Sequence, residues 1–345
     1  MANKTLNTKK IFKIVVIVYA VLFIAGIIST VVFGPKLDIN FSGGTKISYS
    51  YTGDIAEKDF KDAVATVLDK EFTVSKNTSL AGDVNCLVIT LAGKNSISAE
   101  TQENITSALV EKFGDNEIEI YDSTSVSPTI AGSFFLKSLV AILITAILVI
   151  VYVGIRFRKI GGISAALTAF CALILDLLVA FFICVIFRLP IDMNFMAVVL
   201  TILGYSLNDT IVIYDRVREN KRLYPELSVA ENMDLSVSST LVRNIVTTVT
   251  TVCAVLTIVV VSEIFGLTTL RSFSIPMAFG LLSGCFSSLF ISGPLWVIYK
   301  ERKAKKNFYT FKRHRLISDA SFLFEYCLHS VYNFAYCLYH LGRAF

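Results

Sequence analysis

Six long apolar stretches dominate this chain, and each is long enough to cross a lipid bilayer. A membrane-spanning helix needs about 20 predominantly apolar residues. Hydrophobic residues make up 54% of the chain and charged residues only 17%, a balance that excludes an ordinary soluble globular protein. We therefore predict a membrane protein built on a bundle of six transmembrane helices. The apolar stretches lie at about 14–33, 134–153, 163–187, 193–214, 242–261 and 274–299.

Charge is sorted between the segments that join these stretches. The segment 34–133 carries eight lysines and fifteen acidic residues, whereas basic clusters follow the second, fourth and sixth stretches, at 156–159, 216–222 and 300–315. Loops rich in Lys and Arg stay on the cytoplasmic side of a membrane. We therefore expect both ends of the six-helix block to be cytoplasmic and residues 34–133 to be extracytoplasmic.

Four regions follow from this pattern. Residues 1–33 form a cytoplasmic N-terminus with the first helix, 34–133 an exported domain, 134–299 helices two to six, and 300–345 a basic cytoplasmic tail. The tail is expected to contact anionic membrane lipid rather than nucleic acid. Polar residues on one side of 317–345 favour a helix lying in the membrane interface over a seventh span.

The exported segment alternates between strand and helix patterns. Strands are predicted at 45–51, 72–76, 85–91 and 117–123, and helices at 55–68 and 97–113. The order β-α-β-β-α-β is that of a ferredoxin-like α+β domain. The two glycines of Ser42-Gly43-Gly44-Thr45 precede a strand rather than a helix, which indicates a tight turn and not a phosphate-binding loop.

Neither a metal nor a cofactor is indicated, and the chain carries no signature of hydrolytic chemistry. Of seven cysteines, only Cys86 lies in the exported segment, so no disulfide or metal framework is predicted. The G-x-x-x-x-G-K-[ST] loop of ATP-hydrolysing proteins does not occur in the sequence. We therefore expect a protein that is not an enzyme.

Three ionisable residues stand inside apolar stretches, where each costs several kcal/mol and needs a partner or a function. They are Asp176, Asp209 and Arg243. Helical spacing places Asp209 on a polar stripe with Thr201, Tyr205 and Asn208, while Thr247 continues the face of Arg243.

Asp209 and Arg243 are predicted to lie at similar depth, because one helix runs inward and the next runs outward. At 1.5 Å per residue, the six residues from Asp209 to Asp215 place the carboxylate about 9 Å inside the boundary. The pair is expected to meet, and two interpretations stay open. It is either a proton-exchanging site or a static ion pair that only holds two helices together.

Small residues recur every fourth position in the last apolar stretch. Gly280, Gly284, Ser288 and Ser292 form a stripe that lets a neighbouring helix approach closely. Packing is the predicted use of this stripe.

Residues 203–220, LGYSLNDTIVIYDRVREN, closely resemble the G-Y-S-x-N-D-T-x-V-x-[FY]-D-R-x-R-E-N signature of the SecF family. Residues 38–45, DINFSGGT, are similar to the D-F-x-G-G-T element that opens the exported domain of this family. Asp176 and Arg243 match its third-span aspartate and fifth-span basic residue. Leu175 departs from the His that the family often has before that aspartate. The remaining matched positions are Asp38, Gly43, Gly44, Thr45, Gly204, Asp215, Arg216, Arg218, Glu219 and Asn220.

The resemblance implies a bacterial inner-membrane subunit that works with a SecD-like partner, the SecYEG channel and the SecA motor. Its cargo would be an unfolded preprotein, driven in late export by the proton gradient. Two alternatives remain open: a half-transporter of the resistance-nodulation-division superfamily that exports lipid or drug, and a scaffold in which the buried ions only hold helices.

Overall fold

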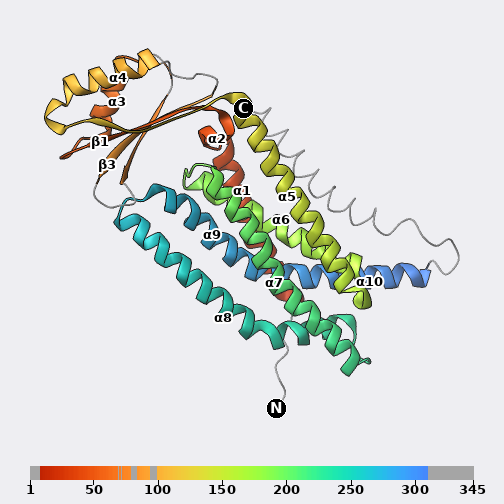
Figure 1. Ribbon diagram of the computed structural model, residues 1–345. Helices are drawn as coiled ribbons and strands as arrows, with labels where there is room; N and C mark the ends of the chain where they lie inside the picture. The colour runs from red at the N-terminus through yellow and green to blue at the C-terminus, as the bar shows by residue number, and fades with distance from the viewer. Residues whose placement is uncertain (1–7, 69, 71, 79–83, 94–98, 310–345) are drawn as a thin grey trace.

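The computed structural model describes residues 8–309, apart from 69, 71, 79–83 and 94–98. Within that part the chain forms an elongated helical bundle with a small α+β domain at one end (Figure 1). The interfacial helix predicted at 317–345 lies outside the described residues.

Six helical spans in the described part are long and apolar enough to cross a membrane, which confirms the predicted number. The first five are single helices, and the sixth is composed of α9, a π-helical segment and α10. Their bounds are α1 (Thr8–Phe33), α5 (Pro128–Arg156), α6 (Gly162–Ile186), α7 (Met193–Leu223), α8 (Val229–Ile264), α9 (Thr268–Ser287), the π-helical segment (Ser288–Ser292) and α10 (Gly293–Tyr309).

The sixth span and α6 occupy the centre of the bundle, whereas α1 and α5 are mostly exposed at its edge. The glycines of the small-residue stripe explain how closely α9 approaches its neighbours. A Cβ atom on Gly284 would lie 2.9 Å from Cβ of Ser206 on α7, and one on Gly280 would lie 2.2 Å from Cδ1 of Ile202. The packing role predicted for these two glycines is therefore confirmed.

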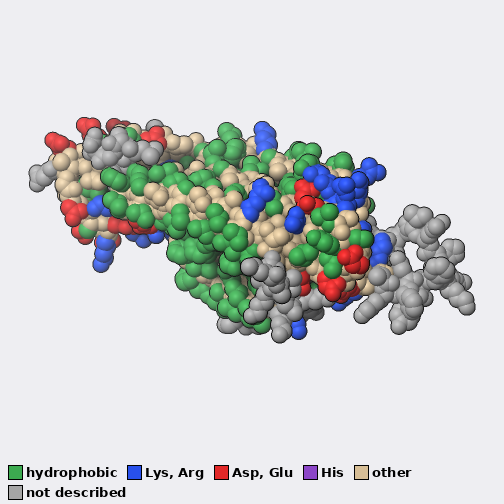
Figure 2. All heavy atoms as spheres, turned by 90° about the horizontal axis from the view of Figure 1, so that it is seen from below, with side chains coloured by type: hydrophobic (Ala, Val, Ile, Leu, Met, Phe, Trp, Pro, Cys, Tyr) green, Lys and Arg blue, Asp and Glu red, His purple; other side chains and the backbone are tan. Residues whose placement is uncertain are grey.

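The outer surface of the bundle is apolar. On the face shown in Figure 2, acidic side chains gather at the two ends, and hydrophobic side chains cover much of the middle. Large apolar residues such as Ile17, Leu148 and Val242 are more than half exposed. Such a surface is stable in lipid and not in water, and the chain is therefore an integral membrane protein.

The domain between α1 and α5 contains one antiparallel sheet with strand order β2-β3-β1-β4. Helices α3 and α4 cover one face of this sheet, and the other face is turned toward the bundle (Figure 1). The order of its elements agrees with the six that the sequence predicts. Their bounds are β1 (Gly44–Tyr51), α3 (Glu57–Ala65), β2 (Thr73–Thr78), β3 (Asn85–Ala92), α4 (Ala99–Lys112) and β4 (Glu119–Val126).

A one-turn helix, α2 (Ile39–Ser42), joins the bundle to the sheet. Asp38 caps its first turn, and Phe41 packs against Phe134 and Phe135 of α5. Gly43 follows with φ +77°, and a Cβ atom there would lie 2.8 Å from Cα of Pro128. Both the backbone angle and the close approach require glycine, so the tight turn predicted from the sequence is confirmed.

Candidate functional site

Asp176 lies near the middle of α6 and is completely buried. Three serine hydroxyls donate hydrogen bonds to its carboxylate: Ser206 of α7 at 2.7 Å, and Ser283 and Ser287 of α9 at 2.6 and 2.8 Å. A charge in a membrane interior is costly unless polar groups replace its water. These hydroxyls satisfy the carboxylate from two neighbouring helices.

Tyr19 extends this cluster to the first span. Its hydroxyl lies 2.7 Å from Oγ of Ser283 and donates to the Ser283 carbonyl at 3.0 Å. Four helices, α1, α6, α7 and α9, therefore meet at one buried polar centre, which we call the Asp176 cluster. We define it as Tyr19, Asp176, Ser206, Ser283 and Ser287.

Asp209 is the second buried carboxylate and lies on α7, three residues beyond Ser206. Within the described part of the chain its side chain accepts one hydrogen bond, from the Thr248 hydroxyl of α8 at the long distance of 3.4 Å. Asp209 is thus held much less tightly than Asp176. A carboxylate with few fixed partners changes its proton occupancy with little rearrangement of its surroundings.

Arg243 does not form the predicted contact with Asp209. Between these two described residues there is no ion pair. Arg243 lies on the exposed side of α8 and lines a cavity near the end of α7. The static ion pair considered from the sequence is therefore not formed in this structure.

The polar stripe predicted on α7 is divided between two environments. Thr201 and Asn208 of that stripe are exposed on its surface, as are the neighbouring Gly204 and Thr247 of α8. Tyr205 is half-buried and donates a hydrogen bond to Thr251 of α8 at 3.1 Å. We call the four exposed positions the polar face of α7 and α8.

Further hydroxyl pairs connect α7 to the π-helical segment. Thr210 and Ser288 lie 2.8 Å apart, and Tyr214 lies 2.8 Å from both Ser292 and Thr168 of α6. Ser288 and Ser292 of the predicted stripe thus form hydrogen bonds in addition to packing. Segments of π-helix are rare and often occur at functional positions.

The last turns of α7 carry the charged end of the matched signature. Asp215 forms ion pairs with Arg156 and Arg218, each at 3.0 Å, and Arg216 pairs with Glu219 at 2.6 Å. Buried Asn220 donates to Ser236 of α8 at 2.9 Å. These contacts connect α7 to α5 and α8.

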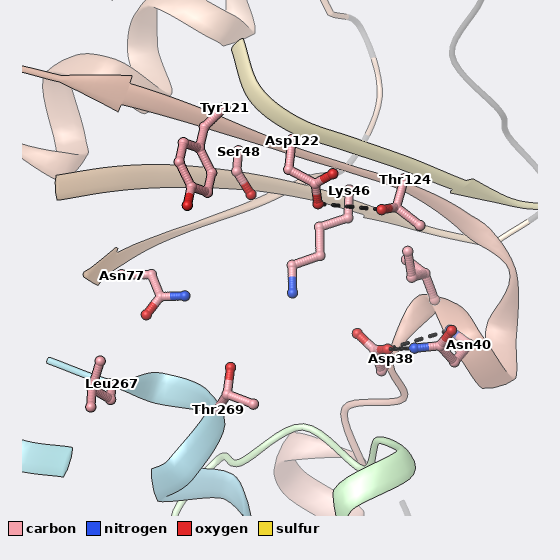
Figure 3. A pocket seen from close by; sticks show the side chains of 11 residues that line it. Asp38, Asn40, Lys46, Ser48, Asn77, Tyr121, Asp122, Thr124, Leu267 and Thr269 are labelled. Atoms are coloured by element: carbon pink, nitrogen blue, oxygen red, sulfur yellow. Dashed lines mark hydrogen bonds between the residues drawn. The ribbon is translucent and has the colours of Figure 1, made fainter. Parts of the chain in front are cut away.

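At the other end of the bundle, a polar cavity of about 470 Å³ separates the sheet from the segment between α8 and α9. Figure 3 shows the Lys46 side chain of β1 directed into this space, with Asp38 below its amino group and Asp122 of β4 above. The Thr268 backbone N–H donates to the Asn77 side chain at 3.4 Å and closes one side. The remaining matched residue of this region, Thr45, lies 3.2 Å from Ser125 on β4.

Sequence reasoning identified Asp176 but missed the serines that hold it. The predicted stripe contains Gly284 and Ser288, which directly follow Ser283 and Ser287 in the sequence. The stripe was the more visible pattern, because its small residues recur at every fourth position. The available signal was the pair of serines four residues apart in an apolar stretch, which places two hydroxyls on one helical face. Nothing local connects that face to Asp176, which lies more than a hundred residues earlier.

The model of the family described as "Protein export membrane protein SecD/SecF, C-terminal" matches residues 105–302. This match covers more than half of the chain. The chain belongs to the SecD/SecF family. The protein translocase subunit SecF of Borreliella burgdorferi is 31% identical over 310 residues, which cover 87% of this chain and all of that protein.

Relatives named SecDF are longer than this chain, which spans less than half of their length. The SecDF of Bacillus subtilis is 35% identical over 295 residues, which cover 82% of this chain but 37% of that protein. The crystal structure of SecDF from Thermus thermophilus superposes with a TM-score of 0.72 at 22% identity, over 87% of this chain and 39% of that one. That likeness establishes the fold.

Proposed function

We propose that this chain is a SecF-type subunit of the Sec protein export system of a bacterial inner membrane. Membership of the SecD/SecF family carries the proposal. The subunit would work with a SecD-like partner, the SecYEG channel and the SecA motor on an unfolded preprotein. Its role would be mechanical coupling rather than enzymatic catalysis, without a cofactor.

The polar face of α7 and α8 supports the need for a partner. Thr201, Asn208 and Thr247 are exposed on spans that have no water around them in a bilayer. Polar groups facing hydrocarbon are unfavourable, whereas polar and small residues between helices favour association. A second helical bundle placed on this face would cover these residues and place Asp209 close to the interface.

In the proposed topology, residues 1–33 and 134–299 form the membrane part, and 300–345 is a cytoplasmic tail. Residues 34–133 form an extracytoplasmic domain. The strand order β2-β3-β1-β4 and two helices on one face favour the ferredoxin-like class for this domain. The cavity of Figure 3 lies between it and the bundle, where a change in helix packing would reach the sheet.

Proton coupling is assigned to Asp209, with Arg243 as the nearby charge and Asp176 as the second carboxylate. One charge moved through the membrane potential provides about 2.3 kcal/mol per 100 mV. That energy shifts a two-state equilibrium about fortyfold or more. Only a group that gains and loses a proton can use it.

Asp209→Asn tests this assignment, because it keeps the side-chain size but cannot ionise. The measurement is preprotein translocation into membrane vesicles with and without a proton gradient, with the membrane level of each variant determined. We expect Asp209→Asn to be present at the normal level and to lose the gradient-dependent part of translocation. Asp209→Glu, which remains ionisable, should retain a measurable part of it.

Two other outcomes would contradict the assignment of proton coupling to Asp209. If Asp209→Asn retains the full gradient response, Asp209 is not the coupling carboxylate and Asp176 becomes the candidate. If the variant fails to accumulate or to assemble with the partner, the scaffold interpretation is favoured.

A further inference from the structure

A second cavity, of about 1010 Å³, opens between the last turns of α7 and the first half of α8. Its volume is at the upper end of the roughly 300–1,000 Å³ of typical small-molecule sites. Four arginines and two acidic residues line it, which gives an excess of two positive charges. The charged residues are Asp215, Arg216, Arg218, Glu219, Arg222 and Arg243.

Both acidic residues of this cavity are already engaged. Asp215 pairs with Arg156 and Arg218, and Glu219 pairs with Arg216. Arg222 and Arg243 form no ion pair within the described part of the chain, and both are exposed. Two guanidinium groups therefore remain available to a ligand.

The surroundings of the cavity are those of a membrane surface. Leu223 at its edge is 58% exposed, and next to Arg243 the outward side of α8 carries Val242 and Val246 at 70% and 56%. The same helix thus passes from a cationic cavity to a lipid-exposed apolar face. A fitting ligand has an anionic head and an apolar tail.

We infer that this cavity binds the head group of an anionic phospholipid. The phosphate would accept hydrogen bonds from Arg222 and Arg243, whose planar guanidinium groups match phosphate oxygens. The acyl chains would lie along the exposed valines of α8. Basic cavities between transmembrane helices at the membrane surface are suited to such head groups.

The test measures lipid binding by the purified full chain in detergent with native mass spectrometry. The added probes are phosphatidylglycerol and phosphatidylcholine of equal chain length. We expect selective retention of phosphatidylglycerol. Arg222→Gln and Arg243→Gln should each weaken that binding about fivefold, the effect of losing about 1 kcal/mol per basic residue.

Arg158→Gln is the matched control, because Arg158 is exposed in the segment between α5 and α6 and does not line the cavity. It should leave lipid binding unchanged. Equal retention of the two lipids, or an equal loss in Arg158→Gln, would overturn the assignment. Either result would mean that the surface charge as a whole, or no charge, determines lipid binding.

Two further arms separate other occupants of the cavity. Soluble glycerol phosphate at the same concentration should not displace the lipid, and efficient displacement would show that a free phosphate ester is the ligand. A complex with the SecD-like partner should retain phosphatidylglycerol. Its loss on assembly would instead assign the two arginines to acidic residues of the partner and contradict the inference.

Discussion

Among single residues, the two buried carboxylates differ in how firmly they are held. Asp176 accepts three hydrogen bonds of 2.6–2.8 Å, whereas Asp209 accepts one of 3.4 Å from Thr248. Short bonds from three fixed hydroxyls stabilise one arrangement of the helices. This difference favours Asp176 as a structural centre and Asp209 as the group that changes its charge.

Replacing Asp176 by alanine should therefore destabilise the bundle itself. Three buried serine hydroxyls would lose their acceptor, and leaving buried polar groups unsatisfied costs about 1–3 kcal/mol. We expect Asp176→Ala to lower the thermal unfolding temperature of the detergent-solubilised chain. Asp176→Asn should do so less, because its carbonyl still accepts hydrogen bonds. Equal stability of Asp176→Ala and the parent chain would contradict the structural role of the cluster.

The sequence was sufficient to locate Asp176 and Asp209, because a charged residue in an apolar stretch is visible without any structure. It was not sufficient to show what surrounds them. Ser206, Ser283 and Ser287 reach Asp176 only through tertiary packing, and serine is common in transmembrane helices for many reasons. The predicted Asp209–Arg243 contact failed because equal depth in the membrane does not determine which side of a helix faces its neighbour.

At the scale of helices and strands, the length of an apolar stretch in the sequence gives the part of a helix that lies in the membrane. It does not give the full length of that helix. The apolar stretch predicted at 242–261 lies within the much longer α8, which begins at Val229 after a capping box formed by Ser228 and Glu231. Polar residues continue such a helix beyond the lipid, so its ends follow from capping and not from hydropathy. The strands of the α+β domain were easier to predict, because alternation of polar and apolar residues is typical of a half-buried sheet.

The contact between α9 and α7 provides a prediction at this scale. In Gly284→Ala the new methyl group would meet Cβ of Ser206 at 2.9 Å and force the two helices apart. Overpacking of this kind costs about 1–3 kcal/mol, measured as a lower unfolding temperature in detergent. Gly132→Ala on α5 is the control, because nothing lies within 4 Å of its Cβ position. A loss of stability in both variants would indicate a general effect of removing glycine.

For the whole molecule, the arrangement in the membrane depends on the sorting of charge. The number of spans agrees with the sequence, and their direction across the membrane is a prediction from the charge pattern. Cys86 is the one native cysteine between the first two spans, but it lies in β3 with only 4% of its surface exposed and is poorly accessible to a thiol reagent. A direct test needs introduced cysteines at exposed positions.

Lys58→Cys on α3 and Glu226→Cys between α7 and α8 provide such positions, since both residues are exposed. In a cysteine-free chain, a membrane-impermeant maleimide should label Lys58→Cys only from the extracytoplasmic side and Glu226→Cys only from the cytoplasmic side. Permeabilised cells show that both thiols can react. Labelling of the two cysteines from the same side would exclude the six-span topology.

The π-helical segment at Ser288–Ser292 divides the sixth span into α9 and α10. It changes the rotation of α10 about the span axis relative to α9. One residue of an α-helix corresponds to about 100° of rotation, so a wide turn allows α10 to face another direction than α9. Before the segment, Ser283 and Ser287 donate hydrogen bonds to Asp176 of α6, and at its last residue Ser292 lies within hydrogen-bond distance of Tyr214 of α7. If that wide turn moved along the span, α9 would rotate while α10 stayed in place, and Asp176 would lose the two hydroxyls of α9 and keep that of Ser206, without any helix leaving the bundle.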